Sequence, residues 1–298
     1  MRSILITGAN GFVGSYLERR GSARNEIIAT GSGAARIAFG PDTVYESTDI
    51  TDPSAVKDLL ARHQPAVIVH AAAISQPDLC EKDPALADRV NIDGTRNLLE
   101  AVAGSDAHFI FLSTDFVFDG KRGLYREEDP VGPVNYYGET KLAAERLVRQ
   151  YPGLWSIART VLVYGDPCGA RGNLLTMVAG ALREGRALRI FNDQLRTPTF
   201  VEDLADGILA IIDRRAGGTW HLSGEDVRTP YEMAMETAQL LELDASLITP
   251  ITGRDMKELA RRPQKTGFDI SKAKKELAYA PTSFAEGLAR TFCMEKER

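Results

Sequence analysis

The sequence predicts an α/β protein built on a doubly wound parallel sheet, and three observations support this prediction. Short, nearly continuous apolar runs such as "SILIT" (3–7) and "AVIVHAA" (66–72) are typical of strands covered on both faces. Segments with helical apolar spacing alternate with these runs, which is the order of successive βαβ units. A glycine-rich turn, "ITGANGFVG", joins the first run to the first helix. A chain of 298 residues is long enough for such a sheet and a second, smaller lobe.

The first half of the chain supplies most of the strands. After the strand at 3–7, strands are predicted over 26–30, in a third region that precedes "STDITD", over 66–72, over 108–114 and over 156–165. Helices are predicted from about Gly11, over "DPALADRVNIDGTRNLLEAVA", and over the stretch that contains "YYGETKLAAE".

The regular alternation of strand-like and helix-like segments ends near Gly165, after which Gly and Pro become frequent. A strongly amphipathic helix, "VEDLADGILAIIDRR", and a short strand, "GTWHLSG", then look again like sheet-and-helix material. We therefore expect a dinucleotide-binding domain over 1–164 and a smaller substrate-binding lobe over 165–298. Residues 201–223 are expected to return to the first domain.

Composition places the chain among ordinary globular proteins. Apolar residues make up 44% of the sequence, charged residues 26%, and the formal net charge is -5. No basic run interleaved with aromatic residues occurs, so we expect no nucleic-acid partner. The longest apolar stretches are too short to span a bilayer, and the N-terminus lacks the features of a signal peptide. We therefore expect no membrane association.

The cysteines indicate neither a disulfide framework nor a zinc site. Cys80, Cys168 and Cys293 are far apart, odd in number and outside any CxxC motif. We therefore expect reduced thiols and a cytoplasmic protein. No cluster of carboxylates with histidine suggests a bound metal, and we expect none.

The glycine-rich turn has the strand–turn–helix context of a Rossmann-like dinucleotide site. Gly8, Gly11 and Gly14 allow the tight turn, the close approach of a pyrophosphate and close helix–strand packing. The N-terminus of the following helix offers N–H groups and a positive dipole end to phosphate. The candidate cofactor contacts in this turn are Gly8, Asn10, Gly11, Phe12, Val13 and Gly14.

The second strand favours NADP(H) over NAD(H), which stays possible. NAD sites usually carry an acidic residue at the end of this strand, where it binds the ribose 2′-hydroxyl. Here Thr30, Gly31 and Ser32 occupy that place, and Arg36 follows, where it can meet a 2′-phosphate. The alternative for Arg36 is a solvated surface arginine. Ser32 and Arg36 are candidate cofactor contacts.

Two residues of "STDITD" are candidates for the adenine end of the site. Asp49 is placed to contact the base, with Ile50 packing on the ring. The alternative for Asp49 is a helix N-cap, although Asp52 before Pro53 is the better candidate for that role.

Tyr137 and Lys141 are four residues apart and therefore project from one helix face. A free tyrosine titrates near pH ~10, and a neighbouring ammonium group favours the phenolate and lowers that pKa. Lys141 can also bind the nicotinamide ribose, and Tyr137 can donate a proton to a carbonyl oxygen. The alternative is a chance Tyr-x-x-x-Lys on an amphipathic helix.

"FLSTDFVFDG" supplies hydroxyl groups at the carboxyl edge of the sheet, where doubly wound folds bind ligands. We expect Ser113 or Thr114 to hold a carbonyl oxygen beside Tyr137, and Asp115 to orient the substrate. The alternative is that these side chains satisfy local backbone groups at the strand end.

Six segments occur in order over most of the chain: "TGANGFVG", "HAAA", "STDFVFDG", "YYGETK", "RTVLVYG" and "RTPTFVEDLADGI". Together they resemble the extended short-chain dehydrogenase/reductase family. Within it, "STDFVFDG", "KLAAE" and "RRPQKTGFDISKAKKEL" are most similar to the dTDP-4-dehydrorhamnose reductase group. The resemblance implies a dinucleotide fold with a C-terminal sugar-nucleotide lobe.

The resemblance also implies roles for individual residues. It implies a catalytic set of Thr114, Tyr137 and Lys141, and a supporting role for Asn91. It places Arg196 beside the nucleotide diphosphate, with an ion pair to Glu202 or Asp203 as the alternative. Small residues are expected to line the cofactor at Ala71, Ala72 and Ala73, and Ser113 is a further candidate cofactor contact.

These roles predict an NADPH-dependent reductase of a 4-keto sugar nucleotide, most simply dTDP-4-dehydrorhamnose, with Tyr137 as the proton donor. Two departures from the group change the expected sugar pocket: Leu162 replaces a tryptophan and Phe116 replaces a tyrosine. The alternatives are a sugar-nucleotide epimerase, another keto-sugar reductase, or a non-catalytic NADP-binding subunit resembling the regulatory subunit of methionine adenosyltransferase. A homo-oligomer is left open.

Overall fold

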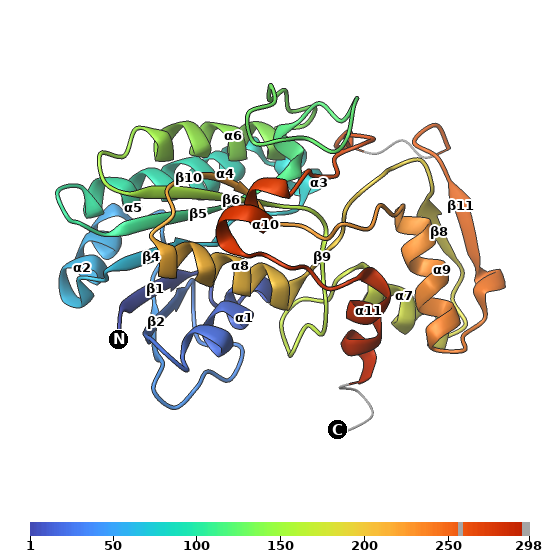
Figure 1. The fold of residues 1–298 in the computed structure, drawn as a ribbon, viewed down its shortest axis with the longest axis horizontal. Helices are drawn as coiled ribbons and strands as arrows, with labels where there is room; N and C mark the ends of the chain where they lie inside the picture. Colours follow the sequence, from blue (N-terminus) through green and yellow to red (C-terminus); the bar gives the residue numbers. More distant parts are fainter. Residues whose placement is uncertain (256–258, 294–298) are drawn as a thin grey trace.

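The central feature of the fold is a seven-stranded sheet in which every strand pairs in parallel (Figure 1). The structure is a computed structural model that describes residues 1–255 and 259–293. The strand order is β10-β6-β5-β4-β1-β2-β3. The strands span Ser3–Thr7 (β1), Glu26–Gly31 (β2), Val44–Ser47 (β3), Val67–His70 (β4), His108–Thr114 (β5), Trp155–Thr160 (β6) and Gly218–His221 (β10). The predicted doubly wound, Rossmann-like fold is confirmed.

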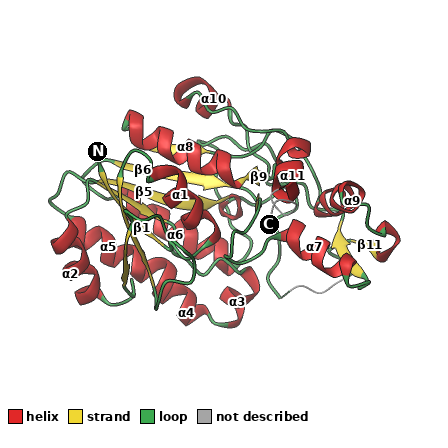
Figure 2. Ribbon diagram, turned by 90° about the horizontal axis from the view of Figure 1, so that it is seen from below, coloured by secondary structure: helices red, strands yellow, loops and turns green. Residues whose placement is uncertain are grey.

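Helices cover both faces of the sheet (Figure 2). Successive residues of a strand point to opposite faces, so Ile4 and Ile6 pack in one core and Leu5 in the other. The first core contains helices α1 (Phe12–Gly21) and α8 (Val201–Arg214). The second contains α2 (Pro53–His63), α5 (Gly94–Val102) and α6 (Tyr136–Arg149).

The direction of strand addition reverses between β1 and β4. The chain adds β2 and β3 on one side of β1 and then returns to add β4, β5 and β6 on the other. Such a reversal opens a crevice at the carboxyl ends of the two central strands, where ligands bind in open α/β sheets. The glycine turn after β1 and the alanine run after β4 therefore meet at this crevice.

A smaller group of elements lies beside the carboxyl edge of the sheet (Figure 1). Strands β8 and β11 pair in parallel, and α7 and α9 pack on them around Val178, Ile190 and Ala234. The elements span Leu174–Arg183 (α7), Leu188–Phe191 (β8), Pro230–Leu240 (α9), Ile248–Ile251 (β11) and Phe284–Cys293 (α11). Shorter helices are Pro77–Lys82 (α3), Pro84–Asp88 (α4) and Ser271–Leu277 (α10), with a π-helical turn at Arg89–Asp93 and 3₁₀ turns at Asp115–Val117 and Ala245–Leu247.

The strand predicted over 156–165 is two strands in the structure. β6 ends at Thr160, and β7 (Val163–Tyr164) leaves the main sheet to pair with β9 (Thr199–Phe200). Leu162 causes the break, because its φ of 34° is left-handed and cannot continue a strand. By contrast, α8 and β10 lie within the layers of the main sheet. The division into two domains at residue 164 remains a prediction.

Candidate active site

The backbone of the glycine turn forms a concave surface, the glycine cradle, that side chains at the glycine positions would fill. Gly8 has a φ of 70°, and a Cβ on it would lie 2.7 Å from the backbone nitrogen of Ala72. A Cβ on Gly14 would lie 2.4 Å from the carbonyl oxygen of Gly8. Because the N-cap of α1 is Gly11, no side chain caps this helix, and its first N–H groups can serve an anion. The turn therefore fits the pyrophosphate of a dinucleotide, with Phe12 and Val13 in the first helical turn.

The alanine run after β4 lines the same crevice. Ala71, Ala72 and Ala73 are all partly buried and follow the last residue of the strand. The backbone of Ala72 approaches Gly8 so closely that only a glycine fits at position 8. These positions agree with the expected cofactor contacts, which remain a prediction.

Of the four residues expected at the adenosine end, three lie on the surface and one is buried. Ser32 and Arg36 are exposed. Asp49 is also exposed, and its Oδ1 accepts hydrogen bonds from the backbone N–H and the hydroxyl of Thr51. Asp52, not Asp49, caps α2. Ile50 is buried, since its side chain fills the space over Gly94.

Two segments, β5 and α6, bring the expected catalytic side chains together at the carboxyl edge of β5. Thr114 is the last residue of β5, and Tyr137 lies in the first turn of α6. Asn135 begins this helix by accepting a hydrogen bond from the backbone N–H of Gly138. A Cβ on Gly138 would lie 2.2 Å from the carbonyl oxygen of Phe116, so glycine allows α6 to approach the turn after Thr114. The Tyr137 ring meets the Phe116 ring edge to face at 5.8 Å between centroids.

Burial raises the pKa of Tyr137 above its ordinary value, and a hydrogen bond with the side chain of Thr114 acts in the opposite direction. The sequence predicts a lowered pKa caused by Lys141. The structure differs because the loss of hydration outweighs the other effects. A phenol that keeps its proton at neutral pH is suited to act as an acid.

Lys141 lies one helical turn after Tyr137 and is almost fully buried. Its ammonium group lies 3.9 Å from the centroid of the Phe111 ring. Burial lowers the pKa of Lys141 to about 7, although the charge of Glu145 raises it. Lys141 therefore changes charge near neutral pH.

This lowered pKa predicts how stability depends on pH. Between about pH 7 and the ordinary value of 10.5, unfolded Lys141 binds more protons than the folded residue, so the folded state gains stability as the pH rises. From pH 7 to pH 9 we expect wild type to gain about 2 kcal/mol in unfolding free energy relative to Lys141→Met. Urea unfolding of both cofactor-free proteins at several pH values measures the difference. A difference in unfolding free energy between the two proteins that does not change with pH would contradict burial of Lys141 as a neutral amine.

Ser113 is directed away from the expected carbonyl site. Its hydroxyl donates a 2.7 Å hydrogen bond to Glu145, which is buried between α6 and β6 and also binds Arg159. Of the two hydroxyl residues at this strand end, Thr114 is the one beside Tyr137.

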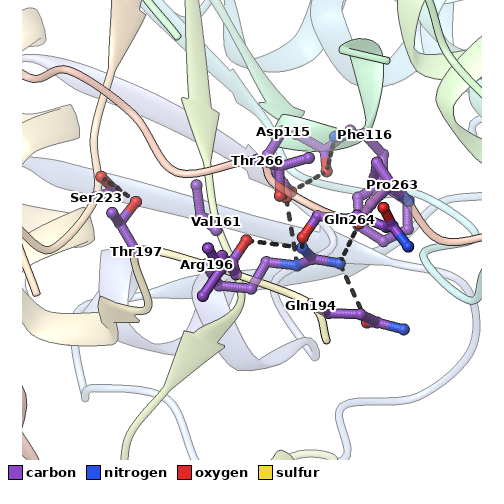
Figure 3. Close-up of polar contacts among 12 residues, drawn as sticks. Asp115, Phe116, Val161, Gln194, Arg196, Thr197, Ser223, Pro263, Gln264 and Thr266 are labelled. Carbon is purple, nitrogen blue, oxygen red and sulfur yellow. Dashed lines mark hydrogen bonds and ion pairs between the residues drawn. The ribbon is translucent and has the colours of Figure 1, made fainter. Parts of the chain in front are cut away.

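Arg196 is the centre of a buried polar network that reaches Asp115 (Figure 3). Its guanidinium group donates to the carbonyl oxygens of Leu195, Pro263 and Gln264 and to the side chain of Gln194, and its Nε lies 3.9 Å from Asp115. Arg196 is 3% exposed. It lies near Asp115, whereas Glu202 pairs with Arg20 and Arg290, and Asp203 accepts hydrogen bonds from Thr282. Arg196 therefore connects the segments around residues 115, 195 and 264. Its expected contact with a diphosphate remains a prediction.

Asp115 links this network to the catalytic cluster. Its carboxylate accepts hydrogen bonds from the hydroxyls of Thr114, at 3.1 Å, and Thr266. Burial raises the pKa of Asp115, whereas the charge of Arg196 lowers it. Asp115 thus contacts Thr114 in the catalytic cluster and Thr266 near the C-terminal part of the chain.

The segment 260–267 connects α3, α6 and the Arg196 network. The guanidinium of Arg262 and the N–H of Ala260 both donate to Asp78 in α3. Asn135 donates to the carbonyl oxygen of Arg261. "RRPQKTGFDISKAKKEL" is one of the segments that carry the resemblance, and this signal could have pointed to Thr266.

Two further buried polar side chains, Asn91 and His70, form hydrogen bonds within the protein. Asn91 accepts a hydrogen bond from the N–H of Ile74 and donates to its carbonyl oxygen and to Thr140. His70 bonds Thr7 and Thr95, and burial lowers its pKa to about 3. Among residues 1–255 and 259–293, no group of His, Cys, Asp and Glu is arranged to hold a metal ion. Over the same residues, no helix has the length and apolar character needed to cross a membrane.

Comparison with known proteins defines the family. The profile described as "RmlD substrate binding domain" matches residues 1–296, so the chain belongs to this family. This agrees with the resemblance seen in the sequence, which is thereby confirmed.

Individual relatives carry different activities. The dTDP-4-dehydrorhamnose reductase of Streptomyces griseus is 36% identical over 281 residues, which cover 91% of this chain and 86% of that protein. Methionine adenosyltransferase 2 subunit beta of Pongo abelii is 32% identical over 277 residues, which cover 91% and 81%. A solved dTDP-4-dehydrorhamnose reductase of Bacillus anthracis, in complex with NADP, superposes with a TM-score of 0.85 at 26% identity and covers 98% of this chain and 99% of that one.

Proposed function

We propose that this protein is an NADPH-dependent reductase of a 4-keto sugar nucleotide, most simply dTDP-4-dehydrorhamnose. The observation that carries the proposal is the meeting of Thr114, Tyr137 and Lys141 at the carboxyl edge of the sheet, in the fold that also supplies the glycine cradle. The similarity to the Streptomyces griseus reductase and the NADP complex of the Bacillus anthracis reductase support the same assignment.

The residues of the crevice fit a dinucleotide. The backbone of Gly8, Gly11 and Gly14 and the start of α1 would hold the pyrophosphate, and Ser32 and Arg36 would meet the 2′-phosphate. Bound NADPH supplies hydride to a carbonyl carbon. The alanines after β4 leave room for the cofactor at the crevice.

The chain's own side chains would manage the proton and the carbonyl group. Tyr137 donates its hydroxyl proton to the carbonyl oxygen as the carbonyl is reduced. Thr114 orients the oxygen beside Tyr137. Lys141, when protonated, binds the ribose and stabilises the phenolate that Tyr137 becomes.

The direct test is NADPH oxidation, followed by absorbance, with purified protein and dTDP-4-dehydrorhamnose. We expect turnover with NADPH and a slower reaction with NADH. Tight binding of NADPH without turnover on this or another keto sugar nucleotide would contradict the proposal. Retention of NAD through purification, with no net consumption of NADPH, would favour an epimerase instead.

A second candidate function follows from the similarity to methionine adenosyltransferase 2 subunit beta. In that case the protein would bind NADP and a synthetase partner without catalysing a reaction. The presence of Thr114, Tyr137 and Lys141 argues for the enzyme. Association with a purified methionine adenosyltransferase, together with the absence of turnover, would favour the second candidate.

A further inference from the structure

A polar clamp outside the catalytic cluster joins the glycine turn to the loop that follows β2. Asn10, which lies between Gly8 and Gly11, is buried. Its Oδ1 accepts a 2.8 Å hydrogen bond from the backbone N–H of Arg36. Its Nδ2 donates to the carbonyl oxygen of Ala34 at 3.2 Å and to the hydroxyl of Tyr45 at 2.9 Å. Both amide protons of Asn10 are therefore used within the protein.

Tyr45, in β3, forms the other half of the clamp. Its hydroxyl lies 2.7 Å from the carbonyl oxygen of Gly33 and 3.2 Å from that of Gly31. The hydroxyl has one proton, so it donates to these carbonyls while it accepts from Asn10. The Tyr45 ring stacks on Phe39, with 5.2 Å between centroids and 14° between planes. The ring is therefore held by packing, and the hydroxyl is fixed above the loop.

The loop itself has little else to define its shape. Residues 32–36 are all exposed. Gly33 has a φ of 78° and open space around its Cβ position. An exposed glycine-containing segment costs conformational entropy to order, and hydrogen bonds to its backbone offset that cost. The clamp provides three such bonds: Asn10 donates to Ala34 and accepts from the N–H of Arg36, and Tyr45 donates to Gly33.

We propose that Asn10 and Tyr45 are positioning residues for cofactor selectivity: they hold the 32–36 loop so that Arg36 meets a 2′-phosphate. This rests on the proposed use of NADP(H). A guanidinium group recognises phosphate through its planar fork of donors, so its orientation matters as well as its charge. Asn10 anchors this loop to the phosphate-binding turn itself, and the distance between the pyrophosphate and the 2′-phosphate is thereby fixed by protein contacts.

The test is binding of two nucleotide fragments, 2′,5′-ADP and 5′-AMP, measured by calorimetry on the full chain. We expect wild type to prefer 2′,5′-ADP by at least about tenfold. Tyr45→Phe keeps the stacked ring and removes the hydroxyl, and should weaken 2′,5′-ADP about fivefold while 5′-AMP stays within about twofold. Loss of affinity for both fragments alike would indicate a general structural role and overturn the proposal.

A double variant tests whether Tyr45 acts through Arg36. Arg36→Ala should remove most of the preference, and adding Tyr45→Phe to it should have little further effect. A full Tyr45→Phe effect in the Arg36→Ala background would overturn the proposal, as would a wild type without preference. The matched control is Tyr151→Phe, since the Tyr151 hydroxyl donates to the carbonyl oxygen of Ala107 elsewhere in the fold, and its preference should equal that of wild type.

Fragment binding separates this inference from the proposed reaction. Neither fragment requires a sugar substrate, so a protein without reductase turnover can still show the predicted preference. Reductase turnover with an unchanged preference in Tyr45→Phe would support the function and overturn the clamp.

Discussion

Tyr137→Phe is expected to lower reductase turnover by about 10²–10⁴-fold, because it removes the proton that the carbonyl oxygen receives. The substitution deletes one oxygen and keeps the ring that packs edge to face on Phe116. The helix start at Asn135 and the glycine cradle are unaffected, so the affinity for NADPH should stay within about twofold. Steady-state NADPH oxidation and fluorescence titration of NADPH measure the two quantities separately.

Tyr136→Phe is the matched control for this prediction. Tyr136 is adjacent in sequence, but its hydroxyl donates to the carboxylate of Asp88 and is directed toward α4. Its removal should change turnover by less than about tenfold, since one surface-proximal hydrogen bond is lost. Full turnover by Tyr137→Phe would exclude this tyrosine as the acid. Equal losses in both variants would point to disruption of α6 and not to chemistry.

Arg159→Met is expected to destabilise the protein by about 3–5 kcal/mol, because it removes one partner of a buried ion pair. Arg159 and Glu145 lie 2.8 Å apart at two pairs of atoms, and their side chains are 1% and 0% exposed. Burial raises the pKa of Glu145, but the hydrogen bonds and charge of Arg159 outweigh it, so the pKa is lowered overall. Methionine would leave this carboxylate buried without its main partner.

Thermal unfolding should show a decrease in Tm of about 10 °C for Arg159→Met. Arg186→Met is the control, because Arg186 pairs with Glu184 on the surface, where both side chains are more than half exposed. Such a pair contributes about 0–1 kcal/mol, so the control should unfold near the wild-type temperature. A small effect of Arg159→Met would mean that Arg149, which also binds Glu145, is sufficient to hold the carboxylate.

The Arg159–Glu145 pair also predicts how the free energy of unfolding depends on pH. The lowered pKa of Glu145 means that its contribution to stability is present above the unfolded value of 4.5 and is lost as the pH falls through the folded value. Wild type should therefore lose stability faster than Arg159→Met below about pH 4.5, so that the difference between them narrows. Urea unfolding at pH 7 and pH 4 measures this, and a constant difference would contradict it.

The strands of the central sheet could be predicted because each is a short apolar run with turn residues beside it. β1 and β5 have the predicted bounds, and β2 and β4 differ from prediction by few residues. The break between β6 and β7 could not be predicted, because "RTVLVYG" is uniformly favourable for a strand. Only the pairing of β7 with β9 gives Leu162 a reason to adopt a left-handed conformation.

The candidate site was predictable where the spacing along one element decides it. Tyr137 and Lys141 share a helix face by their spacing, and the glycine turn follows from its context between strand and helix. Ser113 was harder to place, because its direction depends on the buried Glu145 that lies 32 residues later. Arg196 was harder still, since its partners are carbonyl oxygens near residue 264 and a carboxylate at residue 115.

The sequence by itself determined the parallel α/β architecture, the glycine turn between β1 and α1 and the Tyr–Lys helix, because short-range periodicity and glycine geometry specify these locally. Only the tertiary structure decided how deeply the site residues are buried, and therefore how their pKa values shift. The raised pKa of Tyr137 and the lowered pKa of Lys141 arise from burial by segments far away in the chain. Hydration is lost only when those segments pack, so no local pattern in the sequence can report it.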